Sequence, residues 1–194
     1  MLDCCFVDGV RIDHTESEVD ALLRFIVDKE LNGFVELSMH EGGLALCIMK
    51  EIPKMNYIGV APSHTSVSGE TRLRADKSKR VILLFGDTIS SDIVTTINSW
   101  AADRWPILFY CDGEDRIAQL NIYRNLVRFG DFLGVHDYWN KSRILPELPN
   151  YPCDSLPKPE VYDEDLKFLR KDFQSIRFEP LLHTRIAIYN RRTK

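Results

Sequence analysis

Short apolar runs alternate with helix-like segments along most of the chain. The runs at 34–38, 57–60, 81–85, 107–110 and 132–135 are typical of strands. Apolar residues at helical spacing lie between them, and they predict helices at 44–51, 90–102 and 115–128. The polar segment 61–79 predicts a loop. Strands and helices in alternation indicate a parallel sheet with helices on both faces.

The two ends of the chain carry different patterns. Residues 4–12 predict a hairpin that turns at Asp8-Gly9, and Thr15 and Glu18 predict the cap of a helix that runs to about Glu30. Near the other end, the proline-rich segment 145–159 predicts an irregular loop. A helix at 163–173 should follow, and then strands at 175–178 and 185–189. No helix separates these two strands, so they should pair antiparallel.

Together these elements predict an α/β, Rossmann-like sheet of about seven strands. Most strands should be parallel, and the C-terminal pair should form an antiparallel hairpin. Within one globular unit, residues 1–33 should pack as an N-terminal hairpin and helix on a core formed by residues 34–194.

Composition narrows the function classes. The net charge of −4 disfavours non-specific binding of nucleic acid, which depends on neutralising phosphates. No apolar run approaches the ~20 residues that a membrane span needs, so no membrane partner is expected. The five cysteines have scattered spacing, which predicts free thiols in a reducing cytoplasm. A homo-oligomer is compatible with the sequence.

Polar residues follow four of the predicted parallel strands. Ligands of such sheets bind beyond the carboxyl ends of the strands, so side chains at these positions should converge on a ligand site. The second strand contributes Ala61 at this level. The polar and glycine positions are Ser38, His40, Gly86, Asp87, Asp112, His136 and Asp137.

The turn after the first parallel strand is built from Gly42 and Gly43. Glycine lets the backbone approach a ligand closely, and the helix that begins there supplies unpaired N–H donors. Glu36 lies inside the preceding strand and should hydrogen-bond to backbone or ligand groups. Asp87 and Thr88 could cap a helix, contact the ligand, or do both.

Four stretches in this order resemble motifs of the class I S-adenosylmethionine-dependent methyltransferases, over about residues 30–140. Glu36 to Gly43 is similar to the first motif, E-x-G-x-x-x-G-G. Residues 83–88 resemble the "GD-S/T" stretch of the third strand. Residues 106–113 resemble the fourth-strand motif that ends in Asp, and residues 126–137 resemble the approach to strand five. The subgroup that the chain resembles most is the cephalosporin hydroxylase/rhamnosyl O-methyltransferase type.

The resemblance implies S-adenosylmethionine as the cofactor. Two positions depart from the family pattern. Ser38 stands where glycine is usual, and Ala61 stands where an acidic residue usually binds the ribose. The implied cofactor-binding residues are Glu36, Ser38, His40, Gly42, Gly43, Ala61, Gly86, Asp87, Thr88 and Asp112.

The resemblance also implies catalytic and metal-binding roles for Asp112, His136 and Asp137, which match positions that bind a divalent metal, Mg or Mn, in the subgroup. His136 replaces an expected acid. Imidazole suits zinc, iron or manganese better than magnesium, so either the metal differs or His136 acts as a general base. Tyr138 and Trp139, with the loop 145–159, would form the wall of the acceptor site.

We therefore expect methyl transfer to the hydroxyl or amine of a small-molecule acceptor. One alternative is a methyltransferase-fold protein without activity that acts as a binding or scaffold module, which Ser38 and Ala61 motivate. The other is a metal-assisted hydrolase. His14, His64 and His183 show no metal-ligand spacing and are interpreted as surface or structural residues.

Overall fold

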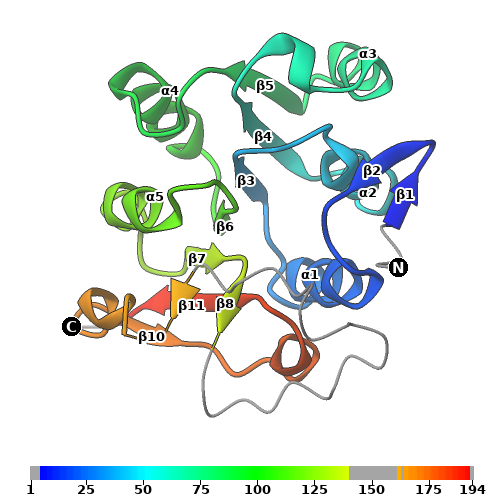
Figure 1. The fold of residues 1–194 in the computed structure, drawn as a ribbon. Helices are drawn as coiled ribbons and strands as arrows, with labels where there is room; N and C mark the ends of the chain where they lie inside the picture. Colours follow the sequence, from blue (N-terminus) through cyan, green and yellow to red (C-terminus); the bar gives the residue numbers. More distant parts are fainter. Residues whose placement is uncertain (1–4, 140–160, 163, 193–194) are drawn as a thin grey trace.

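The computed structural model describes residues 5–139, 161–162 and 164–192 of the chain. At its centre is a sheet of seven strands in the order β10-β11-β7-β6-β3-β4-β5 (Figure 1). β3, β4, β5, β6 and β7 run parallel, whereas β11 pairs antiparallel with both β7 and β10. The strands are β3 (Gly33–Leu37), β4 (Asn56–Ala61), β5 (Val81–Phe85), β6 (Ile107–Cys111), β7 (Phe132–Val135), β10 (Phe173–Ser175) and β11 (Ala187–Arg191). The predicted α/β class, the parallel strands and the antiparallel pair at the end are confirmed.

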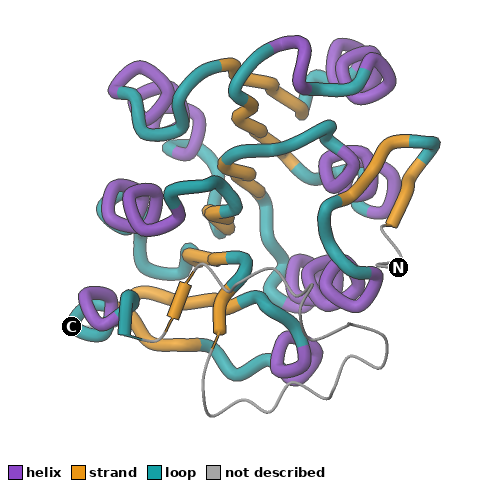
Figure 2. Tube along the Cα trace, viewed as in Figure 1, coloured by secondary structure: helices purple, strands orange, loops and turns teal. Residues whose placement is uncertain are grey.

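Helices cover both faces of this sheet, as Figure 2 shows in purple and orange. One face carries α1 (Glu16–Asp28), α2 (Gly43–Glu51) and α3 (Gly69–Lys77), and the other carries α4 (Ser91–Ala101) and α5 (Arg116–Tyr123). The buried apolar residues form two clusters. Because successive strand residues point to opposite faces, Phe34 and Tyr57 join one cluster and Val35 and Ile58 the other.

The N-terminal elements form as predicted. β1 (Cys5–Val7) and β2 (Val10–Ile12) pair antiparallel around Asp8 and Gly9, whose φ angles of 50° and 81° define a primed turn. Thr15 and Glu18 form the capping box of α1. Leu22 of α1 is fully buried in the same apolar cluster as the central strands. The division of the chain at residue 33 stays a prediction.

Two predicted elements in the middle of the chain are wrong in part. Residues 61–79 are not a plain loop, because they contain the 3₁₀ turn η1 (His64–Ser66) and α3, each started by a serine side chain that caps it. α5 ends at Tyr123 rather than near 128. The buried Asp131 carboxylate accepts hydrogen bonds from the backbone N–H groups of Arg128 and Ile107, which ties the chain into a turn before β7.

The predicted helix at 163–173 is also wrong. Among its described residues, η2 (Lys167–Leu169) is a single 3₁₀ turn, and Phe173 already pairs in β10. The final strands are therefore shifted from 175–178 and 185–189, and a 3₁₀ segment, η3 (Glu179–His183), separates them. A small parallel pair, β8 (Tyr138–Trp139) and β9 (Val161–Tyr162), was not predicted. The proline-rich stretch 145–159 lies outside the described residues.

Among the helices of the described residues, none combines the length and the apolar character needed to cross a membrane.

Candidate functional site

A cleft of about 430 Å³ lies beyond the carboxyl ends of the parallel strands. Its walls come from the loops after β3, β4, β5 and β6, which is where ligands bind in sheets of this type. Five of the predicted cofactor residues line it, and the sequence did not single out the others. The lining residues are Ser38, Met39, His40, Glu41, Pro62, Ser66, Gly86, Asp87, Thr88, Ile89, Glu114, Asp115 and Gln119.

Gln119 of α5 joins three sides of this cleft. Its Nε2 donates to Ser38 Oγ and to Thr88 Oγ1, both at 2.9 Å, and its Oε1 accepts from the Gly113 N–H at 3.3 Å. One buried side chain thus connects the loops that follow β3, β5 and β6. Sequence reasoning missed it, since a glutamine within a helix carries no signal for such a role.

Ser38 lies in left-handed backbone, with φ of 70°. Glycine reaches this conformation without a steric cost, whereas a side chain carries a penalty of about 1–2 kcal/mol. This explains physically why glycine would suit the position. The serine is held there by the hydrogen bond between its Oγ and Gln119.

Gly42 and Gly43 lie against other parts of the chain rather than in the cleft. A Cβ on Gly43 would approach the Arg11 carbonyl oxygen to 2.2 Å, and a Cβ on Gly42 would approach Thr71 Cγ2 to 2.5 Å. Both glycines line a second cavity of only about 10 Å³, which has room for about one water. The need for glycine here comes from internal packing, in contrast to the predicted close approach of a cofactor.

Glu36 also faces this small cavity. It is buried in β3, and its carboxyl accepts a short hydrogen bond from the Tyr57 hydroxyl. Burial raises the pKa of Glu36 to about 8, against the effect of the Tyr57 hydrogen bond. At neutral pH the side chain is therefore mainly protonated, and Tyr57 takes the place that a cofactor group was expected to fill. Ala61 is fully buried at the end of β4.

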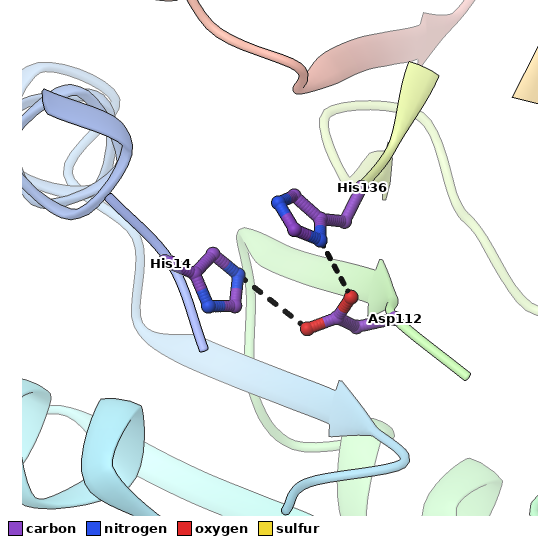
Figure 3. Close-up of side chains that lie close together, drawn as sticks. All are labelled: His14, Asp112 and His136. Carbon is purple, nitrogen blue, oxygen red and sulfur yellow. Dashed lines mark hydrogen bonds and ion pairs between the residues drawn. The ribbon is translucent and has the colours of Figure 1, made fainter. Parts of the chain in front are cut away.

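Asp112, His136 and His14 meet at the ends of β6, β7 and the β2–α1 connection (Figure 3). His136 Nδ1 lies 2.8 Å from one Asp112 carboxylate oxygen, and His14 Nε2 lies 3.4 Å from the other. The two imidazole rings stack with their centroids 4.3 Å apart. All three side chains are at most 8% exposed. We call these three residues the inner cluster.

A shell of ion pairs surrounds the inner cluster. Asp137 is held through both carboxylate oxygens, by Arg116 Nη2 at 2.8 Å and by Arg185 Nη1 at 2.5 Å. Arg185 also pairs with the buried Glu18 of α1 at 3.0 Å. Arg116 lies 3.3 Å from Asp112, so one continuous network links α1, α5, the end of β7 and the approach to β11.

Of the two buried histidines, His136 is positively charged and His14 is neutral. Burial would lower the pKa of His136, but the Asp112 and Glu18 carboxylates raise it to about 10. For His14, burial and the nearby His136 charge lower the pKa to about 4. The imidazolium of His136 and the guanidinium groups of Arg116 and Arg185 then balance the carboxylates of the network. His14 stays neutral, and its Nδ1 has no hydrogen-bond partner among the described residues.

The structure brings Asp112, His136 and Asp137 close together, with His136 Nδ1 3.7 Å from Asp137. It groups the potential metal ligands differently, however. His14, Asp112 and His136 offer ligand atoms within 4.8 Å of one another, whereas Asp137 pairs with two arginines. Of the two interpretations of His14, as a surface or as a structural residue, its burial contradicts the first. Catalytic roles for the three predicted residues stay predictions.

The predicted acceptor residues are not part of the described cleft. Tyr138 is buried, and its backbone N–H donates to the Arg185 carbonyl at 2.9 Å. Trp139 belongs to β8, but its side chain lies outside the described residues. His64 stacks edge-on against Phe85, away from the inner cluster.

No family model matches the chain, and no curated protein matches its sequence at a significant level. Solved structures do match. The apo form of CmcI has a TM-score of 0.69 at 14% identity, over 98% of this chain and 77% of CmcI. A CmcI complex with Mg and S-adenosylmethionine has a TM-score of 0.67 at 16% identity, over 97% and 77%. A putative caffeoyl-CoA O-methyltransferase from Staphylococcus aureus has a TM-score of 0.63 at 10% identity, over 97% and 86%.

At sequence identities this low, the structural similarity to these proteins shows the fold alone. The chain has the fold of the class I S-adenosylmethionine-dependent methyltransferases, as the motif resemblance implied.

The packing of Gly43 gives a direct test. Gly43→Ala should lower the free energy of unfolding by about 1–3 kcal/mol or more, because the new Cβ collides with the Arg11 backbone. Gly69→Ala is the matched control. A Cβ at Gly69, the first residue of α3, meets no atom closer than 4.0 Å, so this change should be neutral or stabilising. Urea denaturation measures both, and equal stability of the two variants would contradict the packing.

The pKa of Glu36 predicts a pH dependence. The unfolded chain loses this proton near the ordinary carboxyl pKa of 4.5, but the folded protein keeps it up to about 8. The stability that Glu36 contributes is therefore complete below pH 4.5 and is lost as the pH rises to about 8. Glu36→Gln stays neutral, so its stability relative to the wild type should rise by more than ~1 kcal/mol across this window. Denaturation at several pH values tests this, with the exposed Glu51→Gln as control, and a flat difference would show that Glu36 is ionised in the fold.

Proposed function

We propose that this protein is an S-adenosylmethionine-dependent methyltransferase that acts on the hydroxyl or amine of a small molecule. The observation that carries the proposal is the cleft of about 430 Å³ at the carboxyl ends of the parallel strands, in a chain with the class I methyltransferase fold. The ligands of similar structures support S-adenosylmethionine as the cofactor. The CmcI complex holds Mg and S-adenosylmethionine, and the human N-acetylserotonin methyltransferase was solved in complex with the same cofactor. A cytoplasmic location is part of the proposal.

The charge of the cleft supports this class of ligand. Four carboxylates line it, whereas no lysine or arginine stands among the described lining residues. Nucleotides with phosphate groups would meet repulsion in such a cleft. A cationic sulfonium and the hydroxyls of a ribose suit it, because carboxylates accept hydrogen bonds and attract positive charge. The four acids are Glu41, Asp87, Glu114 and Asp115.

Glu41 and Glu114 are the two of these acids that can bind the ribose in place of the acidic residue that is missing at Ala61. Asp87 and Asp115 use carboxylate oxygens to cap the Ile89 and Ala118 N–H groups. The side chains of Glu41 and Glu114 have no hydrogen bond to another described residue. We therefore assign the ribose hydroxyls to Glu41 and Glu114, which reach the cleft from the loops after β3 and β6.

In the reaction, the acceptor oxygen or nitrogen forms a bond to the methyl carbon as the bond between that carbon and the sulfonium sulfur breaks. The acceptor loses a proton, and the sulfur leaves as the neutral thioether. Asp112, His136 and His14 form a buried cluster of titratable groups at the strand ends that can take or hold this proton. With a pKa near 10, His136 already carries its proton, so His14, neutral and with a free Nδ1, is the better candidate for a base in the metal-free protein.

The inner cluster also fits a divalent metal. Two imidazole nitrogens and a carboxylate are a donor set for zinc, manganese or iron rather than magnesium, and His14 faces the Asp112 carboxylate with its Nε2. A bound metal would lower the pKa of an acceptor hydroxyl. In that state His136 would give up its proton to the solvent and serve as a ligand.

A binding or scaffold module without activity is the second candidate. The Arg11 carbonyl packs on Gly43, and the inner cluster faces a cavity of about 10 Å³ instead of the larger cleft. In this case no methyl group would be transferred, whether or not the cleft binds the cofactor. The hydrolase alternative has no observation of its own that favours it.

The first test is calorimetric titration with S-adenosylhomocysteine, followed by assays of methyl transfer. Binding should be detected, and Glu114→Gln should weaken it about tenfold, because the ribose loses a charge-assisted hydrogen bond. Glu51→Gln, an exposed acid outside the cleft, is the control and should leave affinity unchanged. Absence of binding at millimolar ligand would rule out the methyltransferase and favour the second candidate. Binding without transfer to any acceptor would favour the second.

Metal dependence can be tested on the protein alone. Zn²⁺ or Mn²⁺ should raise the thermal unfolding midpoint more than Mg²⁺, and the stabilisation should increase from pH 6 to pH 8 as His136 gives up its proton more easily. His14→Ala should remove the effect, while His64→Ala should keep it. Equal stabilisation of the wild type and His14→Ala would assign the metal to other residues.

A further inference from the structure

The outer edge of the sheet at β5 is unpaired. β5 is the last strand in the order, and β4 pairs with it on one side. The bonds from Tyr57 N–H to Arg80 O (2.8 Å) and from Gly86 N–H to Ala61 O (2.9 Å) show which residues face β4. By alternation, the backbone groups of Val81, Leu83 and Phe85 point outward, where no backbone group of a described residue bonds to them.

This edge lacks the usual protection. Edge strands in monomers are commonly kept short or carry a charge, a proline or a bulge, which prevents pairing with another chain. β5 has none of these features, because its sequence is Val-Ile-Leu-Leu-Phe. At the opposite end of the sheet, β10 is shorter and presents the exposed polar residues Gln174 and Ser175.

Exposed apolar side chains gather beside β5. Among the described residues, four of the eight exposed large apolar side chains lie on this strand, on the neighbouring α3 or just after β5. Figure 1 shows α3 and β5 together at the top of the molecule. A groove of about 310 Å³, lined by Ala75, Val81, Leu83 and Phe85 among others, runs between them, so α3 leaves this face of the strand open. The four side chains are Leu73 (49% exposed), Ile82 (39%), Phe85 (39%) and Ile89 (37%).

We propose that β5 pairs antiparallel with β5 of a second copy of this chain, about a two-fold axis at Leu83. In this register Leu83 faces the partner's Leu83, and Val81 faces the partner's Phe85. These are the residues whose N–H and C=O groups point outward, so every one of those groups gains a partner. The two sheets then join into one continuous sheet, and the interface uses the same patch on both subunits.

Charge favours a second copy over an unrelated chain. Basic residues, Lys79 and Arg80, precede β5, and Asp87 follows it. The antiparallel register places Lys79 opposite the partner's Asp87, and the reverse pair occurs at the other end of the interface. A parallel arrangement would instead place like charges side by side. The strand edge is therefore self-complementary in hydrogen bonding and charge.

Analytical ultracentrifugation of the full chain tests the proposal, and it does so independently of any enzymatic activity. We expect a dimer of twice the 22.5 kDa chain mass, and amide exchange at Val81, Leu83 and Phe85 that slows as protein concentration rises. Leu83→Pro should weaken dimerisation at least about tenfold, because it removes the central donor while β4 pairing does not use that N–H. Leu83→Val, which keeps the donor, should remain dimeric.

A charge exchange tests the register without altering buried residues. Lys79→Glu should weaken the dimer several-fold through repulsion from the partner's Asp87, and adding Asp87→Lys should restore it. A chain that stays monomeric at its highest soluble concentration would overturn the proposal. A dimer unaffected by Leu83→Pro and by Lys79→Glu would overturn it as well, because the interface would then lie elsewhere.

Discussion

The Asp112 carboxylate, buried between His14 and His136, is the interaction on which the rest of this structure depends. A buried charge is tolerated only when it is paired and hydrogen-bonded, since removing one partner leaves the other charge uncompensated. Asp112 is compensated by groups from distant parts of the chain, and Glu18, Asp137 and the two arginines complete the balance. The N-terminal segment, the sheet and the C-terminal strand are held to one another by this requirement.

The cleft and the inner cluster are two distinct regions that the proposed chemistry must connect. The cleft that can hold a nucleoside is open and acidic, and Gln119 organises its floor. The inner cluster lies beside a cavity of about 10 Å³, where the Arg11 backbone packs against Gly43. Methyl transfer requires an acceptor to reach both regions. His40 lines both the cleft and the small cavity, and its Nδ1 lies 3.4 Å from Asp13 of the segment 11–14.

Local pattern was sufficient for most of the fold. Buried strands such as β6 and β7 are continuous apolar runs, and helices such as α1 combine an apolar face with a capping box. The errors fall where tertiary contacts override the pattern. The sequence predicts a helix that ends at Phe173, but Phe173 pairs with Arg191 in the sheet. Ser63 and Ser68 looked like loop residues, although their side chains start η1 and α3.

For the site, the sequence by itself determined which residues stand at the strand ends, because the alternation of strands and helices places Ser38, Asp87, Asp112 and His136 at one edge of a parallel sheet. Only the tertiary structure decided what those residues contact. His14 joins Asp112 across 98 positions of the chain, and the glycine turn is filled by the Arg11 carbonyl. Contacts of this kind arise from the packing of segments that are remote in sequence. Neither the spacing of residues nor their periodicity specifies which remote segment packs against a given residue.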